Sequence, residues 1–272
     1  MGEAIITRRG GSGEVIVEFD NFMPSNVELS DEGITHSTPT ALSKGRDTLA
    51  GASVGDYALF AGGYDGSVRN TVDAYDTSLS RSTPTALSVA RYRLAGASVG
   101  DYALFAGGYD GSSYNNTVNA YNTSLSRSTP TALSVARRSI AGASVGDYAL
   151  FAGGYGSSPT YKDTVDAYDT SLTRSTPTAL SVARYRLAGA SVGDYALFAG
   201  GYDVSKNYKT VDAYTPPVPE TRLYMPIGTK YKFGESEETA ESNEITVSVP
   251  LTGYIKYKSG VVGTEGSAPD DS

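Results

Sequence analysis

A stretch of fifteen residues, AGASVGDYALFAGGY, occurs four times without change and constrains the fold more than any other feature. The copies span residues 50–64, 95–109, 141–155 and 188–202, so their starts lie 45, 46 and 47 residues apart. Its Val, Tyr and Phe favour strands, and its glycines at fixed places favour tight turns. A repeat of this length is typical of a unit that buries its apolar faces against its neighbours. The chain is therefore predicted to form an all-β array of four similar sheets.

Each unit predicts four antiparallel strands in one order. In the first unit, LAGASV is the inner strand, Gly55 and Asp56 form a two-residue turn, and YALFAGG is the second strand. TVDAY is the third strand and STPTAL is the outer one, because a proline is tolerated only at an edge. Small residues on the inner strand suit an axis where sheets converge, and the second strand is apolar on both faces, as expected when both are covered. This is the pattern of a β-propeller blade.

The order of the segments predicts how the ring closes. An STPTALS segment begins at Ser37, Ser82, Ser128 and Ser175, so the first one precedes the first inner strand, and none follows the last TVDAY at residues 210–214. Residues 37–43 are therefore expected to pair beside residues 210–214 as the outer strand of the fourth sheet. Such pairing removes the open edges of the array. The prediction is a closed four-bladed propeller over residues 35–214, and the alternative is a half-ring that dimerises.

The segments on either side of the repeats are predicted to be separate. Residues 1–34 carry two short strands, 4–7 and 14–19, which we expect to anchor and link the repeats. The proline-rich residues 215–219 form a stiff linker. Residues 220–262 are expected to form a small β unit, and residues 263–272 a disordered tail. The strands expected in the small unit are residues 222–225, 245–249 and 254–257.

Composition excludes several functional classes. The net charge of −8 opposes binding to nucleic acid. The sequence has no run of eighteen apolar residues, so no membrane-spanning helix is predicted. There is no cysteine and a single histidine, His36, which we expect in a solvated loop; neither a metal nor a cofactor is expected. The first residues lack the order of charges and apolar residues of a secretory signal, so export by that route is not expected.

Several repeated residues resemble the kelch repeat. An arginine precedes each inner strand (Arg46, Arg91, Arg137, Arg184), a Gly-Gly doublet ends each second strand, and Tyr75-Asp76 and Tyr168-Asp169 end two third strands. The resemblance fails at the kelch tryptophan, whose place is taken by Ser37, Ser82, Ser128 and Ser175. It covers about two thirds of the chain and implies a propeller that binds partners through one face. The ITRRGG stretch near the N-terminus resembles the start of phage and prophage tail-associated proteins.

Candidate binding residues lie where the repeats differ. The loop after each Gly-Gly-Tyr and the residues after each repeated arginine vary, and strand directions place both on one face of the array. Their Tyr, Arg, Asn and Lys side chains supply stacking surfaces and forked donors for a glycan or a protein epitope. The predicted site consists of Tyr92, Arg93, Asp110, Tyr114, Asn115, Arg138, Tyr161, Tyr185, Arg186, Lys206, Asn207 and Tyr208.

No catalytic constellation emerges from the sequence. Asp73 and Asp76 recur as Asp166 and Asp169, but the second unit has asparagines at both positions, which cannot do acid–base chemistry. We therefore expect a non-enzymatic binding or structural module of a virion or phage-tail-like particle, with a host-surface glycan or protein and other virion proteins as partners, and a possible homo-oligomer. The alternatives are a cytoplasmic kelch-type protein-interaction module and a carbohydrate-active enzyme.

Overall fold

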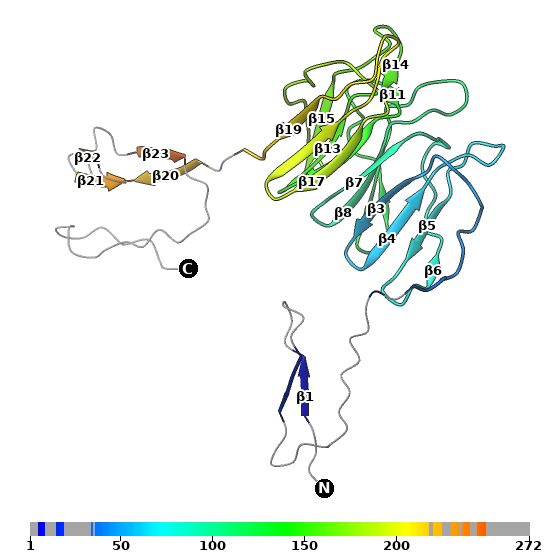
Figure 1. Cartoon of the computed structure of the whole chain (residues 1–272), viewed down its shortest axis with the longest axis horizontal. Helices are drawn as coiled ribbons and strands as arrows, with labels where there is room; N and C mark the ends of the chain where they lie inside the picture. Colours follow the sequence, from blue (N-terminus) through cyan, green and yellow to red (C-terminus); the bar gives the residue numbers. More distant parts are fainter. Residues whose placement is uncertain are drawn as a thin grey trace. The chain divides into compact units, whose positions relative to one another are not determined.

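The computed structural model describes residues 5–8, 15–18, 34, 36–217, 220–224, 230–233, 236–239 and 244–248 (Figure 1). All regular secondary structure in these residues is β, in antiparallel sheets, as the repeat predicts. Within them, no helix is long and apolar enough to cross a membrane. The chain divides into two compact units, Met1–Ala41 and Leu42–Ser272.

Each of the four repeats forms one antiparallel sheet, which we call repeat sheets 1 to 4. Sheet 1 consists of β3 (Ala50–Val54), β4 (Tyr57–Ala61), β5 (Val72–Tyr75) and β6 (Arg81–Ser82), and sheet 2 of β7 (Ala95–Val99), β8 (Tyr102–Ala106), β9 (Val118–Asn122) and β10 (Arg127–Ser128). Sheet 3 consists of β12 (Ala141–Val145), β13 (Tyr148–Ala152), β15 (Val165–Asp169) and β16 (Arg174–Ser175), and sheet 4 of β17 (Ala188–Val192), β18 (Tyr195–Ala199) and β19 (Val211–Tyr214). The predicted inner, second and third strands are thereby confirmed.

The tight turn between the first two strands fixes their register. In sheet 1, Val54 lies opposite Tyr57, and Gly55 between them has a φ of +50°. A left-handed φ suits glycine because it has no Cβ. Asp56 and its equivalents Asp101, Asp147 and Asp194 are exposed in these turns, as expected for turn residues.

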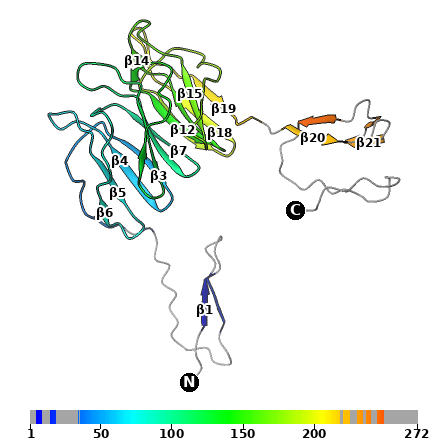
Figure 2. The same ribbon diagram turned by 180° about the vertical axis from the view of Figure 1, so that it is seen from behind.

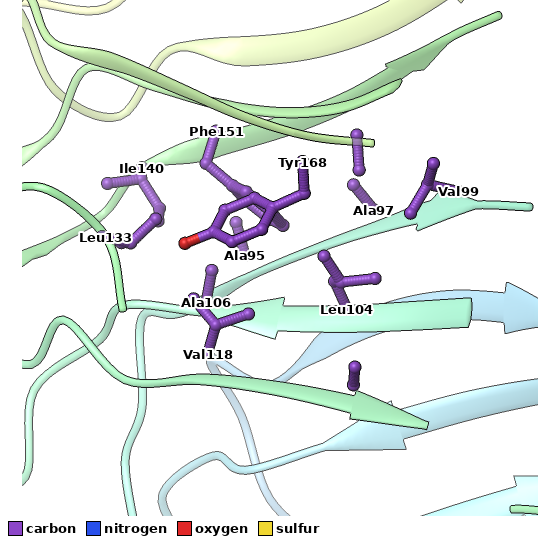
Figure 3. Packing of buried hydrophobic residues seen from close by; sticks show 12 residues of the cluster. Ala95, Ala97, Val99, Leu104, Ala106, Val118, Leu133, Ile140, Phe151 and Tyr168 are labelled. Atoms are coloured by element: carbon purple, nitrogen blue, oxygen red, sulfur yellow. The ribbon is translucent and has the colours of Figure 1, made fainter. Parts of the chain in front are cut away.

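The sheets pack face to face in chain order, with β3 against β7, β7 against β12, and β12 against β17 (Figures 1 and 2). Each junction buries aromatic side chains of the later sheet against small and aliphatic side chains of the earlier one. At the junction of sheets 2 and 3, Phe151 and Tyr168 from sheet 3 lie against Ala97 and Leu104 of sheet 2 (Figure 3). The second strands β8 and β13 are buried on both faces, as predicted from their apolar sequence.

A buried arginine ties the start of each repeat to its own sheet. Arg137 has no exposed side-chain surface; its Nη1 lies 2.7 Å from a carboxylate oxygen of Asp166, and its Nη2 donates to the carbonyl of Phe151. Arg46 pairs with Asp73 in sheet 1 at 2.8 Å, and Arg184 pairs with Asp212 in sheet 4 at 2.7 Å. In each case the arginine links the second strand to the third.

Sheet 2 has an amide in place of this carboxylate. Arg91 is fully buried and donates to the side-chain oxygen of Asn119 at 3.0 Å, so its charge has no anionic partner there. Burial lowers the pKa of Arg91 to about 10. In sheet 1, burial would raise the pKa of Asp73, but hydrogen bonds from Ser43 and Arg46 outweigh it and leave that pKa below its usual value.

The outer strand differs from its prediction, because it is only two residues long and most of STPTALS lies outside the strands. After pairing with β5, the chain crosses to sheet 2, where the carbonyl of Thr85 accepts a hydrogen bond from Tyr121 at 2.7 Å. The amide of Ser88 then donates to Asn119. Proline has no N–H to continue a ladder, and tyrosine and asparagine of the next sheet satisfy the freed backbone groups.

The predicted closure of the ring is not formed in the structure. Residues 36–46 contain no strand, and sheet 4 has three strands instead of four. The inner strand β17 is exposed along its whole length, whereas β7 and β12 alternate between buried and half-buried residues. Residues 36–46 form no strand because the STPTALS segments act as crossovers that pack on the following sheet. The backbone amide of Ser43, for example, donates a hydrogen bond to Asp73.

The flanking segments form hairpins. Of the predicted strands, β1 (Ile5–Arg8) pairs with β2 (Val15–Glu18), and β20 (Glu220–Tyr224) pairs with β23 (Glu244–Ser248). A further hairpin, β21 (Lys230–Phe233) with β22 (Ser236–Thr239), lies between them in a stretch where no strand was predicted. The predicted strand at residues 254–257 and the predicted tail at 263–272 lie outside the described residues.

We expect Asn119→Asp to stabilise the protein by about 1–3 kcal/mol, because it gives Arg91 the anionic partner that the other three arginines have. Chemical denaturation at neutral pH measures the change. The gain should be present above the usual aspartate pKa of 3.8 and disappear as the pH falls through the lowered pKa of the folded state, as for Asp73 and Asp212.

The matched change in the opposite direction, Asp166→Asn, should destabilise the protein, since it removes the partner of Arg137. Equal stability of the wild type and Asn119→Asp across this pH range would show that the buried ion pairs do not hold the sheets.

Candidate functional site

The two variable loop sets meet on one face of the array, at the tyrosine that follows each Gly-Gly doublet. In sheet 2, Tyr109 bridges to Tyr92 on one side and to Tyr114 on the other. In sheet 3, β11 (Arg137–Arg138) pairs with β14 (Tyr155–Gly156), and Tyr155 also bridges to Tyr161. Sheets 1 and 4 have the equivalent bridges. The predicted proximity of the two loop sets is therefore confirmed.

Tyrosine rings form a continuous row across all four sheets. Neighbouring ring centroids in this row lie between 4.3 and 5.8 Å apart. Its two ends are Tyr64 in sheet 1 and Tyr202 in sheet 4, and the hydroxyl of Tyr185 donates a hydrogen bond to that of Tyr202. We call this set the tyrosine row: Tyr64, Tyr92, Tyr109, Tyr114, Tyr155, Tyr161, Tyr185 and Tyr202.

Three arginines lie over these rings. The guanidinium carbon of Arg138 is 4.8 Å from the centroid of Tyr109 and 5.3 Å from that of Tyr155. Arg93 lies over Tyr92, and Arg186 lies over Tyr185 and Tyr202. Among the described residues, none of the three arginines forms an ion pair with a carboxylate. The tyrosine row therefore carries three guanidinium groups without a carboxylate partner, on a protein whose net charge is −8.

One end of the face lies where the chain enters the inner strands, and we call it the inner end. Four residues there have an unusual backbone conformation. Thr48, Arg93, Ser139 and Arg186 occupy the same place in the four repeats, and all have a left-handed φ, between 49° and 55°. They are joined in series: the amide of Arg93 donates to the carbonyl of Thr48, that of Ser139 to Arg93, and that of Arg186 to Ser139. With Leu49, Leu94 and Ile140 they line a cavity of about 320 Å³. Residues held in this region of φ often occur at ligand sites.

Several predicted site residues instead hold their own loops. The carboxylate of Asp110 accepts hydrogen bonds from the amides of Ser112 and Ser113, and the second of these is the main cause of its lowered pKa. Asn115 accepts from Thr117. Tyr208 donates to Asp203 at 2.6 Å, and the ammonium of Lys206 lies over the ring of Tyr208.

The predicted residues therefore divide into three groups. Tyr92, Arg93, Tyr114, Arg138, Tyr161, Tyr185 and Arg186 belong to the tyrosine row or lie over it, while Asp110 and Asn115 stabilise turns. Asn207 is exposed and bridges to Tyr202 through its backbone, and Lys206 and Tyr208 lie beside it in the same loop.

Sequence reasoning missed half of the row. Tyr64, Tyr109, Tyr155 and Tyr202 end the unchanged fifteen-residue stretch, whereas binding residues are predicted only where the repeats differ. A signal was present, because each of these tyrosines lies directly between the doublet and a variable loop. Because the chain leaves the sheet at this boundary, a large aromatic side chain there is expected to lie on the same face as the variable loop.

The acidic pair noted in the sequence is divided between two structural roles. Asp73 is buried against Arg46, while Asp76 accepts hydrogen bonds from Ser78 and Ser80 in an exposed turn, so the two do not form an acid–base pair. His36 is exposed. The described ranges hold no group of three His, Cys, Asp or Glu side chains that could bind a metal ion.

Comparison with protein-family models and with curated protein sequences finds no match to this chain.

We expect Tyr155→Ala to destabilise the protein by about 2–4 kcal/mol, because it removes the ring that contacts Tyr114, Tyr161, Tyr185 and Arg138 at the centre of the row. The matched variant Tyr155→Phe keeps the ring and should change the free energy of unfolding by less than about 0.5 kcal/mol. Urea denaturation of both variants measures the difference. If the alanine variant is as stable as the wild type, the row contributes no packing energy and its rings are independent.

Proposed function

We propose that the chain is a non-catalytic binding module whose tyrosine row recognises a host-surface glycan that carries acidic groups. The observation that carries the proposal is the unbroken row of tyrosine rings with three guanidinium groups that lack carboxylate partners. The flat rings offer apolar area at low cost in conformational entropy, and their hydroxyl groups suit the polar edges of sugars.

The three guanidinium groups over the tyrosine row favour an anionic ligand. Arg93 and Arg186 border the 320 Å³ cavity at the inner end of the face. An arginine presents a fork of donors that matches the two oxygens of a carboxylate, and such paired hydrogen bonds are stronger than neutral ones. A sugar ring stacked on tyrosine can thus direct a carboxylate toward an arginine.

The fold supports a kelch-like arrangement of four propeller blades. Each repeated arginine lies buried between the second and third strands, and each Gly-Gly doublet lies against the chain that enters the next sheet: Gly63 donates to the carbonyl of Arg91, and Gly108 to that of Arg137. These contacts give a physical role to the residues on which the kelch resemblance rests.

We further propose that the protein is an appendage of a virion or phage-tail-like particle, and that the terminal segments attach it to other particle proteins. The ITRRGG resemblance and the binding face support this proposal. Detection of the protein in purified particles by mass spectrometry tests it. Recovery of the protein only as a free cytosolic species would contradict the particle assignment and leave the binding face to be tested separately.

The binding proposal is tested with the full chain and a panel of oligosaccharides that differ only in whether they carry a carboxylate. Isothermal titration should show binding of the acidic members and weaker or no binding of the neutral ones. Arg93→Ala combined with Arg186→Ala should lower the affinity at least about tenfold, because charge-assisted hydrogen bonds to the ligand are lost.

Arg69→Ala is the matched control. Arg69 lies in the loop of sheet 1 after the Gly-Gly doublet, but its charge is already paired with Asp65 at 2.8 Å, so its removal should change the affinity less than about twofold. Equal binding of acidic and neutral oligosaccharides, or full affinity of the double variant, would contradict the proposal. Binding to a purified surface protein but to no oligosaccharide would favour the protein-epitope alternative.

A further inference from the structure

The three junctions between repeat sheets are copies of one interface. In each, an alanine and a phenylalanine of the later sheet and a tyrosine of its third strand pack on the inner and second strands of the earlier sheet. At the first junction these residues are Ala103, Phe105 and Tyr121, all fully buried.

The inner strands approach so closely that only glycine fits. A Cβ atom on Gly96 would lie less than 3.0 Å from the carbonyl oxygen of Gly51, and Gly142 and Gly189 meet the preceding glycine in the same way. Beside them, the hydroxyl of Ser98 donates to the carbonyl of Ser53, and that of Ser144 donates to the carbonyl of Ser98. Each inner strand thus has a donor side and an acceptor side.

The two ends of the array expose the two halves of this same interface. On sheet 1, Gly51, Ser53 and Ala58 are exposed, and a Cβ on Gly51 would meet nothing nearer than a ring carbon of Phe60 at 3.6 Å. On sheet 4, Val192 is 62% exposed and Val211 is 57% exposed. Their equivalents in sheet 1, Val54 and Val72, are 3% and 1% exposed, because sheet 2 covers them.

We propose that the exposed face of sheet 4 binds the exposed face of sheet 1 in a second copy of the chain, head to tail. The two faces are complementary because they carry the same residues that pack at the three junctions inside the chain. Two chains joined at two such junctions form one ring with two-fold symmetry, which leaves neither face exposed.

The internal junctions favour a second copy over the chain's own first sheet. All three have the same glycine contacts and serine hydrogen bonds, so they set one rotation from each sheet to the next. With that rotation, four sheets leave the faces of sheet 1 and sheet 4 exposed. Closing the ring within one chain would require a larger rotation at every junction, which would separate the strands that are in contact there. Further sheets from another chain continue the array without that cost.

Gly51→Ala in the full chain tests this proposal by sedimentation velocity and native mass spectrometry. The wild type is expected at twice the mass of the chain, and Gly51→Ala at the mass of one chain, since its new methyl group blocks only the junction between copies. Its circular dichroism spectrum should match that of the wild type. Gly96→Ala makes the same change at an internal junction and should lower the midpoint of thermal unfolding.

Complementation tests the head-to-tail geometry. Val192→Arg blocks sheet 4, while Gly51→Ala blocks sheet 1, so each variant alone should be monomeric and a mixture of the two should form a two-chain complex through the one intact pair of faces. Failure of the mixture to associate would overturn the head-to-tail arrangement.

The proposal is also overturned by a wild type that stays monomeric at concentrations of tens of micromolar. In that case, if Gly51→Ala lowers the thermal midpoint as much as Gly96→Ala does, the face of sheet 1 is covered by the protein's own chain. A wild-type dimer that Gly51→Ala does not disrupt would place the contact between copies elsewhere.

Discussion

The buried arginine of each repeat is the interaction on which the rest of the structure depends. A guanidinium group without exposed surface is costly unless its donors are satisfied, so the second strand must offer a carbonyl and the third strand an acceptor side chain. Arg137 places its two terminal nitrogens in this way, Nη2 on the carbonyl of Phe151 and Nη1 on Asp166. The arginine thereby fixes where the chain enters each inner strand. Because Ser139 follows it by two residues, the position of the left-handed residues at the inner end of the face is fixed as well.

Repetition of an unchanged sequence has a second consequence, which concerns the ends of the array. Every repeat carries both halves of the junction, so an open row of such sheets always leaves one half free at each end.

The C-terminal side of sheet 4 shows a further effect, which arises where the sequence departs from the repeat. Tyr214 is followed by Thr215, Pro216 and Pro217, whereas the third strands of other repeats are followed by a turn that ends in a leucine such as Leu172, which packs against the junction of sheets 2 and 3. A mostly apolar cavity of about 170 Å³ beside Pro216 and Val145 lies at this point.

The strands of the repeats could be predicted from the sequence because local pattern determines them. LAGASV and YALFAGG alternate and turn as strands do, and Gly55 fits the turn that joins them. The outer strand could not be predicted in the same way, because the fate of residues 83–88 depends on acceptors and donors in the next sheet, such as Tyr121. The candidate face was predicted in part: variable loops indicated Arg93, Arg138 and Arg186, but variation could not indicate Tyr64 or Tyr155, which are the same in every repeat.

This distribution of constant and variable residues explains how one frame can carry different side chains on the same face in each repeat. The unchanged tyrosines supply a platform at one place in every sheet, and their neighbours add rings or charges to it. Thr48, Arg93, Ser139 and Arg186 have the same backbone conformation, although a left-handed φ costs a residue other than glycine on the order of 1 kcal/mol. The cost is offset because the backbone groups of successive members are hydrogen-bonded to one another. The backbone there is held by the array and not by the side chain, so the side chain at each of these positions can vary without changing the backbone.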